Sequence, residues 1–318
     1  MVPVPLSPVR VGTSGWSYPS GKGTWNGVFY PPKGARPRGF SELAFYAQHF
    51  DTVEINSTFY RPPAPESATK WARETPAGFD FSVKLYQKFT HPEMFVKATG
   101  KDPYDLGTAD VDEFRAGIAP IADAGKLGVL LAQFPASFKD DPNTREYLRW
   151  LLETFREYPL AVELRHRSWS DAAAETLDIL SSGGAAWVQI DEPKFRFSIR
   201  QSFRPNTRGL FYMRLHGRNA ANWWTHDASE DRYNYLYSAK ELEPVAETVK
   251  EAAAKTRKAY VYMNNHYSAK AVANAAVLKH QLGQDLPGEY PPEFVEQYPE
   301  VASIVKTATW SDSSRSLF

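Results

Sequence analysis

The sequence contains no cysteine, which excludes disulfide bonds and metal sites built on thiolates. It also has no excess of charge, because 37 Lys and Arg residues balance 37 Asp and Glu residues. A net charge of zero excludes a strong overall attraction to nucleic acids or membranes, although it is compatible with local basic patches. No stretch approaches the ~18 consecutive apolar residues of a membrane span. The first eight residues contain three prolines and no apolar segment, unlike a signal peptide. We therefore expect a cytoplasmic protein.

The composition is that of a globular protein, with 42% apolar and 23% charged residues in a chain of 318. This length suits one large domain, since barrels of alternating strands and helices are typically ~250 residues long. No repeat, linker or low-complexity block marks a domain boundary. We expect a single domain over residues 1–285, followed by a surface tail over 286–318, where the sequence becomes rich in Pro and Glu and then in Ser.

Short β-branched runs alternate with longer stretches of helical period. Most of the runs are almost continuously apolar, which is typical of parallel strands covered on both faces. The predicted strands are Val9–Thr13, Thr52–Ile55, Asp80–Lys84, Gly128–Gln133, Ala161–Leu164, Ala186–Asp191, Leu210–Leu215 and Ala259–Asn264.

Between these runs lie predicted helices, for example one opened by Asp110 with Glu113 and one opened by Asn143 with Glu146. The stretch between Asp191 and Leu210 has no helical period, so the sixth strand–helix unit is expected to be irregular. Eight strands in alternation predict an α/β fold of the TIM-type (β/α)8 barrel class. A doubly wound parallel sheet is the alternative fold.

Polar side chains gather at the ends of the predicted strands. In a parallel barrel these carboxyl-terminal ends open onto one rim, where active sites lie. The polar residues at or just after the strand ends are Glu54, Asn56, Lys84, Gln133, Glu163, Arg165, Asp191, Arg214, His216 and Asn264. A purely structural network of ion pairs could also account for them. Because burying an ion costs several kcal/mol, a ligand site is the better explanation for so many charges at one rim.

The mixture of carboxylates and cations predicts roles for these residues. Glu163 and Asp191 are the candidate general acid and base, since a cation-rich pocket can shift the pKa values of two carboxylates apart. His216 is a third catalytic candidate. Lys84, Arg165 and Arg214 would bind an anionic group. Glu54, Asn56, Gln133 and Asn264 would complete the ligand-binding set.

The identity of any cofactor is left open by the sequence. Glu54, Glu163, Asp191 and His216 could together hold a divalent metal, because oxygen and nitrogen ligands suit Mn, Mg or Zn. No compact metal motif such as HExxH supports such a site, so a metal is not the favoured interpretation.

Two aromatic segments are expected to overhang the rim. The first begins at Trp16 and Tyr18, and the second, residues 218–237, contains Trp223 and Trp224. Aromatic side chains in loops often pack on their own scaffold. Beside polar strand ends, they also offer a stacking surface for a base or a sugar.

Seven motifs occur in order along the chain. They are GTSGW at 12–16, VEINSTFYRPP at 53–63, FSVK at 81–84, LAQFP at 131–135, VELRHRSW at 162–169, MRLHGR at 213–218 and YMNNHY at 262–267. Together they resemble the DUF72, or YecE-like, family over about residues 9–282. The resemblance implies a TIM-type barrel and assigns no activity.

Three functional hypotheses follow from these observations. The leading one is a barrel enzyme that acts on a phosphate- or carboxylate-bearing substrate by acid–base chemistry. The second is a nucleic-acid-binding protein or nuclease that uses the aromatic segments for stacking, with a nucleotide-like ligand. The third is a protein that binds a small ligand without transforming it.

Overall fold

The computed structural model describes residues 8–100, 106–220 and 229–308 of the chain. Parallel strands form its centre, in the order β2-β3-β4-β5-β6 on one side and β7-β8-β9-β1 on the other. The bounds of these strands are β1 Val9–Thr13, β2 Thr52–Ile55, β3 Asp80–Lys84, β4 Leu127–Gln133, β5 Leu160–Glu163, β6 Ala186–Trp187, β7 Gln189–Asp191, β8 Leu210–Leu215 and β9 Lys258–Met263.

Two junctions close these strands into a barrel. Between β1 and β2, Ser14 pairs with Glu54, and the Gly15 N–H donates a hydrogen bond of 2.8 Å to the Glu54 carbonyl. Strands β6 and β7 occupy one strand position and are separated only by Val188, whose N–H donates to the Val162 carbonyl at 2.9 Å. The predicted TIM-type barrel is therefore confirmed, and the doubly wound alternative is not.

The irregular sixth unit is also confirmed, and its side chains complete the hydrogen bonding of the split strand. Residues 192–209 contain no helix. The Asn206 side chain accepts from Trp187 N–H at 2.7 Å and donates to the Ala185 carbonyl at 2.9 Å. Gln201 likewise accepts from Ile190 N–H at 2.9 Å and donates to the Val188 carbonyl at 2.7 Å. Two amide side chains thus satisfy buried backbone groups of this strand.

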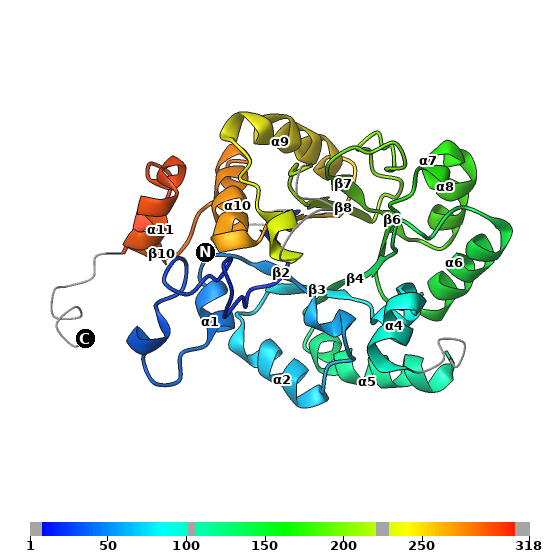
Figure 1. The fold of residues 1–318 in the computed structure, drawn as a ribbon, viewed down its shortest axis with the longest axis horizontal. Coiled ribbons are helices and arrows are strands. Elements are labelled where there is room, and N and C mark those ends of the chain that lie inside the picture. The colour runs from blue at the N-terminus through cyan, green and yellow to red at the C-terminus, as the bar shows by residue number, and fades with distance from the viewer. Residues whose placement is uncertain (1–7, 101–105, 221–228, 309–318) are drawn as a thin grey trace, which may run out of the picture.

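Helices surround the barrel (Figure 1). Their bounds are α1 Glu42–Tyr46, α2 Pro65–Glu74, α3 Gln87–Thr90, α4 Pro92–Thr99, α5 Thr108–Asp123, α6 Pro142–Thr154, α7 Arg167–Asp171, α8 Ala173–Ser182, α9 Ala239–Ala253, α10 Lys270–Gln281 and α11 Pro292–Gln297. Helix α6 begins earlier than its sequence pattern suggested, because Asp141 caps it and Pro142 fits its first turn. Across the described residues, no helix combines the length and apolarity needed to cross a membrane.

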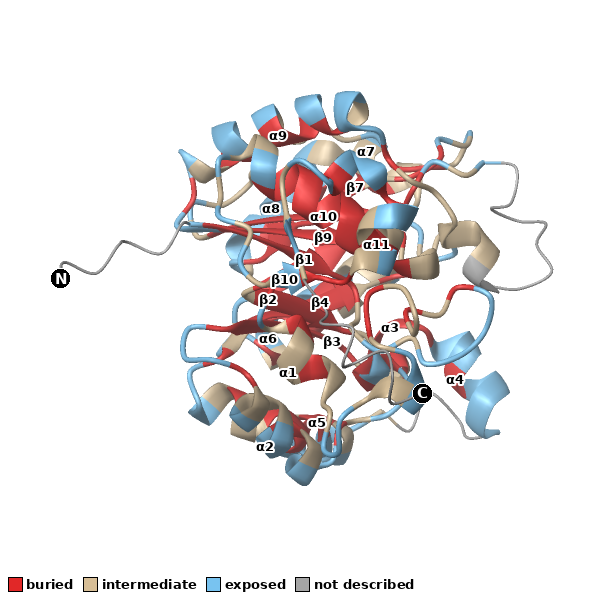
Figure 2. Ribbon diagram, turned by 90° about the vertical axis from the view of Figure 1, so that its left-hand side faces the viewer, coloured by how far each residue is buried: buried red, intermediate tan, exposed pale blue. Residues whose placement is uncertain are grey.

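The core lies in and around the strands, which are buried while the helices expose their outer faces (Figure 2). Tyrosines from β8 and β9 fill the barrel interior, and each hydroxyl has a partner. Tyr262 Oη lies 2.6 Å from Thr52 Oγ1 and 2.8 Å from Ser82 Oγ. Tyr260 donates to Asp80 at 2.6 Å. The interior is therefore filled by side chains, as is usual for eight-stranded barrels, and this layer of it is polar.

The chain after residue 285 differs from the surface tail expected from its composition. Strands β10 (Glu289–Tyr290) and β11 (Lys306–Thr307) pair with each other, and α11 lies between them. Tyr290 and Phe294 are buried, and both rings contact Phe29. Aromatic residues spaced through the Pro- and Glu-rich stretch thus anchor it to the barrel. Residues 309–318 lie outside the described residues.

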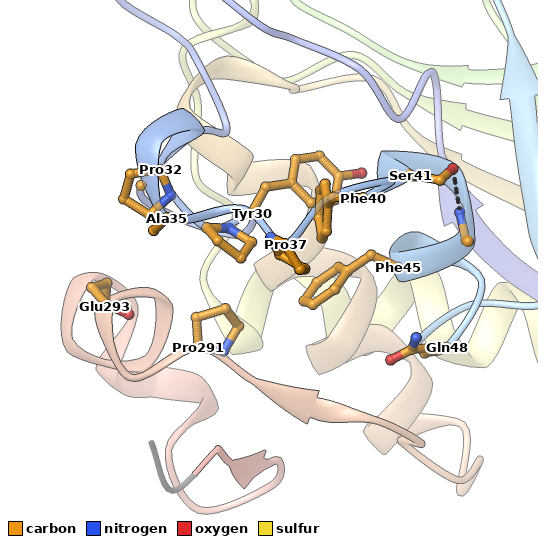
Figure 3. Close-up of a pocket in the computed structure, with 13 residues that line it drawn as sticks. Tyr30, Pro32, Ala35, Pro37, Phe40, Ser41, Phe45, Gln48, Pro291 and Glu293 are labelled. Carbon is orange, nitrogen blue, oxygen red and sulfur yellow. Dashed lines mark hydrogen bonds between the residues drawn. The ribbon is translucent and has the colours of Figure 1, made fainter. Parts of the chain in front are cut away.

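A hollow of about 450 Å³ lies beside these contacts, between the C-terminal segment and the connection from β1 to α1. Figure 3 shows Tyr30, Phe40 and Phe45 on one side of it and Pro291 and Glu293 on the other. Its wall is mostly aromatic and proline side chains, and none of its lining residues is among the polar residues predicted at the strand ends.

Substitution of Gly12 tests how closely β1 approaches β2. A Cβ at Gly12 would lie 2.3 Å from the Thr52 carbonyl oxygen, whereas a Cβ at Gly34 would meet nothing within 4 Å. We expect Gly12→Ala to lower the free energy of unfolding by about 1–3 kcal/mol, because rigid backbone must move. Gly34→Ala is the control and should change it by less than about 1 kcal/mol. Equal values for the two variants in urea unfolding would contradict the tight β1–β2 contact.

Candidate functional site

A cavity of about 810 Å³ opens at the carboxyl-terminal ends of the strands. Of the residues predicted from the sequence, those in its wall are Tyr18, Asn56, Lys84, Gln133, Arg165, Arg214 and Asn264. The other lining residues are Ser57, Phe59, Tyr60, His91, Met94, Pro135, Ala136, Ser137, Arg232, Tyr233 and His266. The strand ends thus converge on one opening, as the barrel topology requires.

Arg214 is the centre of the network beneath the cavity. It is 1% exposed, and its guanidinium donates to Glu54 Oε1 through Nη2 and to Glu163 Oε2 through Nη1, both at 2.6 Å. Tyr212 donates to the second Glu54 oxygen at 2.7 Å, and Arg165 Nε donates to the second Glu163 oxygen at 2.7 Å. Both carboxylates are therefore fully engaged, and both side chains have no exposed surface.

Glu163 does not reach the cavity wall, although it was a candidate for acid–base catalysis. Its burial opposes ionisation, but the charges of Arg214 and Arg165 outweigh that effect and hold the Glu163 pKa well below its ordinary value. A carboxylate with so low a pKa is a weak base and is not protonated near neutral pH. In this structure Glu163 positions Arg214 and Arg165.

His216 also lies behind the wall. Burial lowers its pKa to about 3, so the imidazole is neutral near pH 7. The Asn264 amide donates to Nδ1 at 2.7 Å, and Nε2 lies 3.3 Å from Arg165 Nη2 and 3.6 Å from Glu163 Oε1. His216 thus links two residues of the cavity wall to the network, and it does not face the cavity itself.

Asp191 is not part of the group. Its carboxylate is paired with Arg218, with the shortest contact 2.7 Å from Nη2 to Oδ2, and accepts from the Tyr237 hydroxyl at 2.8 Å. Arg218 can pair with Asp191 because it follows a turn at Gly217, whose φ is +87°, just after β8, and β8 is the neighbour of β7. The sequence pattern placed Asp191 at the correct strand end but could not give this pairing.

The set proposed for a metal does not form a metal site. Glu54 and Glu163 share Arg214, and Asp191 is held by Arg218. In the ranges that the structure describes, no group of three or more His, Asp or Glu side chains is arranged to hold a metal ion. A cation is already present between the two glutamates, in the form of the Arg214 guanidinium.

Lys84 differs from the other charged residues of the site. Its ammonium nitrogen lies 3.9 Å from the centre of the Phe59 ring, and it forms no hydrogen bond or ion pair with any residue that the structure describes. Burial, followed by the charge of Arg214, lowers the pKa of Lys84 to about 7. The amine therefore exists in both protonation states near neutral pH.

An aromatic stack forms one side of the cavity. The Tyr18 ring stacks on His266 with centroids 4.3 Å apart, and Tyr233 contacts the same imidazole at 5.0 Å. Trp16, predicted to bind ligand, instead packs edge-on against Trp71 at 5.7 Å and is absent from the cavity wall. Trp223 and Trp224 lie outside the described residues.

Several wall residues were not among the predicted site residues. Phe59 follows β2 and His266 follows β9, so both lie within motifs that the sequence displays. Their position after a strand end was a usable signal. Tyr233 lies in the 3-10 helix Ser229–Tyr233, within the aromatic segment 218–237 that the sequence predicted to overhang the rim. His91 lies between α3 and α4, away from the strand ends, and no sequence signal marks it.

The comparisons with known proteins agree with this architecture. The model of the family described as "Protein of unknown function DUF72" matches residues 10–295. The chain belongs to the DUF72 family. It is 29% identical over 290 residues to the UPF0759 protein YunF of Bacillus subtilis, covering 89% of this chain and 98% of that protein. It is 32% identical over 129 residues to the UPF0759 protein YecE of Escherichia coli, covering 40% of this chain and 43% of that protein.

Solved structures of DUF72 proteins share the fold. The crystal structure of a family member from Thermotoga maritima is 35% identical, with a TM-score of 0.70 over 87% of this chain and 99% of that one. A member from Enterococcus faecalis is 24% identical, with a TM-score of 0.74 over 88% and 98% of the two chains. These likenesses establish the family and the fold of this DUF72 protein.

Removal of Arg214 should destabilise this DUF72 protein strongly. Arg214→Met leaves Glu54 and Glu163 buried without their shared cation, so we expect a loss of about 3–5 kcal/mol in the free energy of unfolding. Lys250→Met is the control, since Lys250 and Glu247 form an exposed ion pair that should contribute less than about 1 kcal/mol. Urea unfolding at pH 7 measures both, and a loss under about 1 kcal/mol for Arg214→Met would contradict the network.

His216 should make stability depend on pH in mildly acidic solution. Its pKa is about 3 when folded and 6.5 in the unfolded chain, so between these values the unfolded chain binds the extra proton. Stability contributed by His216 is therefore lost as pH falls below 6.5, by up to about 1.4 kcal/mol per pH unit. Urea unfolding gives the free energy of unfolding at pH 6 and at pH 5. The difference between these two values should be smaller for His216→Gln than for the parent chain. An unchanged difference would mean that His216 titrates normally.

Proposed function

We propose that this protein is a barrel enzyme that binds a small phosphate- or carboxylate-bearing molecule in the barrel-mouth cavity and acts on it by proton transfer. One observation supports this most directly. The cavity wall contains Lys84, Arg165, Arg214 and Arg232, whereas no Asp or Glu residue lines it in the described ranges. The glutamates that balance this charge lie behind the wall, where a ligand does not meet them.

The wall also has polar groups that suit a ligand. The Asn56 side-chain oxygen and His266 Nδ1 are buried and have no hydrogen-bond partner among the residues that the structure describes. A buried polar atom without a partner is unfavourable by about 1–3 kcal/mol, which a ligand hydroxyl or amine would offset. Together with the cations, these groups favour a substrate that carries hydroxyl groups as well as an anionic group.

Proton transfer is assigned to Lys84 in place of Glu163 and Asp191. A general base or acid is most efficient when its pKa lies near the operating pH. Lys84 meets this condition with a pKa of about 7 and lines the cavity, whereas Glu163 is a permanently ionised buried anion. The proposed reaction is therefore still acid–base chemistry, with Lys84 as the group that transfers the proton.

The aromatic stack favours a nucleotide-like anion as a second candidate ligand. Tyr18, His266 and Tyr233 present a stacking surface beside the cationic wall. A planar ring placed against it would gain roughly 1–3 kcal/mol from stacking. A protein that binds such a ligand without turnover would be stabilised thermally, and the ligand would be recovered unchanged.

Sulfate binding tests the anionic site, because sulfate keeps its charge between pH 6 and pH 8.5. Lys84 is mostly protonated at pH 6 and mostly neutral at pH 8.5, since its pKa is about 7. We therefore expect calorimetry to show roughly tenfold tighter binding at pH 6, equivalent to about 1.4 kcal/mol. His91 and His266, with pKa values of about 3 and about 4, stay neutral over this range.

Three variants complete that test. Lys84→Met should remove the pH dependence, and Arg165→Met should weaken binding at both pH values. Lys240→Met is the control, since Lys240 lies on the exposed side of α9, and should bind as the parent chain does. No saturable sulfate binding to the parent chain at pH 6, or equal binding by Lys84→Met and the parent at both pH values, would refute the proposed anionic site.

A further inference from the structure

We propose that Lys84 is a nucleophile that forms an imine with the substrate, and that the substrate is an aldehyde or ketone carrying a carboxylate or phosphate. This inference rests on the proposed function and names its substrate class. It starts from the position of the amine, which lines the cavity, lies over the Phe59 ring at 3.9 Å and has no hydrogen-bond acceptor in the described part of the chain. No bound carboxylate therefore holds the amine in its protonated, non-nucleophilic form.

Arg214 and Arg165 have a different role from Lys84. Arg214 is fixed by Glu54 and Glu163, and Arg165 by Glu163, so their charges stay in place near the cavity. These guanidinium groups attract the anionic group of the substrate and also disfavour a third positive charge on Lys84. Burial beside a fixed cation is one of the ways in which lysine is activated as a nucleophile.

The surroundings also suit the product of the reaction. An iminium ion carries one positive charge, as the protonated amine does. The face of the Phe59 ring stabilises a cation at that nitrogen, and the buried Glu54 and Glu163 favour positive charge at longer range. The site can therefore hold the amine neutral before attack, and the anionic group of the bound substrate offsets the positive charge of the adduct afterwards.

The step balances without a further reactant. The Lys84 nitrogen attacks the carbonyl carbon, so a C–N bond forms and the carbonyl oxygen takes a proton from solvent. The resulting carbinolamine loses its hydroxyl group, together with the proton first carried by nitrogen, as water. The second N–H proton of the amine stays on the nitrogen. Overall, the amine, the carbonyl compound and one H⁺ give the iminium ion and water. The positive nitrogen then acidifies the adjacent C–H bond, and because the iminium nitrogen has no free lone pair, the proton released there goes to solvent.

Pyridoxal 5′-phosphate is a suitable probe, because it combines an aldehyde, a phosphate and a planar ring. The folded full-length chain is mixed with a stoichiometric amount of pyridoxal 5′-phosphate at pH 7.5, and the imine is reduced with borohydride. Peptide mass spectrometry then locates the adduct. We expect one dominant adduct at Lys84. Pyridoxal, which lacks the phosphate, should give at least about tenfold less, since each tenfold corresponds to about 1.4 kcal/mol of binding.

Two variants serve as test and control. Lys84→Arg carries a fixed positive charge in place of the amine, so it should lose the adduct while remaining folded. Lys194→Arg is the matched control, because burial also lowers the pKa of Lys194, yet Lys194 donates to the Ile190 carbonyl and does not line the cavity. It should be labelled at Lys84 like the parent chain. The initial rate of labelling should rise through pH 7 and level off above it, whereas an ordinary lysine would keep rising toward pH 10.

Parallel sulfate competition separates failure of this inference from failure of the proposed function. If sulfate binds but no adduct forms at Lys84 between pH 6 and pH 9, the nucleophile is refuted and the anionic site stands. If labelling is spread over exposed lysines and is unaffected by sulfate, both are refuted. An adduct at Lys84 that sulfate suppresses, and that Lys84→Arg abolishes, supports both.

Discussion

The buried contact of Arg214 with Glu54 and Glu163 is the interaction on which the site depends. It joins strands β8, β2 and β5 across the barrel interior, with both donor–acceptor distances at 2.6 Å. Each ion would be very unfavourable there alone, because desolvation costs several kcal/mol per charge. Each partner therefore requires the other two. The polar rim is stable only as a network, and its two carboxylates also hold Arg165 and Tyr212 in place.

The network also explains why the chemistry falls to a lysine. It engages all four oxygens of Glu54 and Glu163, so the obvious acids and bases of the strand ends act as structural anions. The wall of the cavity in front of them contains cations. One of these is Lys84, whose side-chain nitrogen has no hydrogen-bond acceptor in the described chain. One arrangement of charges thus produces an anion-attracting surface and an amine with a lowered pKa.

Much of the fold and part of the site could be predicted from the sequence. Continuous apolar runs located the strands, because both faces of a parallel strand are buried. The rule that strand ends meet at one rim brought Lys84, Arg165 and Arg214 together correctly. Pairing between side chains could not be predicted, because it depends on turns such as the one at Gly217, which pairs Asp191 with Arg218.

The state of the Lys84 amine tests this account most directly. The chain can be labelled with ¹³C at the lysine Cε atoms, and the Lys84 resonance assigned by comparison with Lys84→Arg. The account predicts that this resonance titrates with a pKa of about 7, far below the value of about 10.4 of an ordinary lysine side chain. A Lys84 that titrates with the exposed lysines would show that it carries an ordinary charge, and the roles assigned to it would fall.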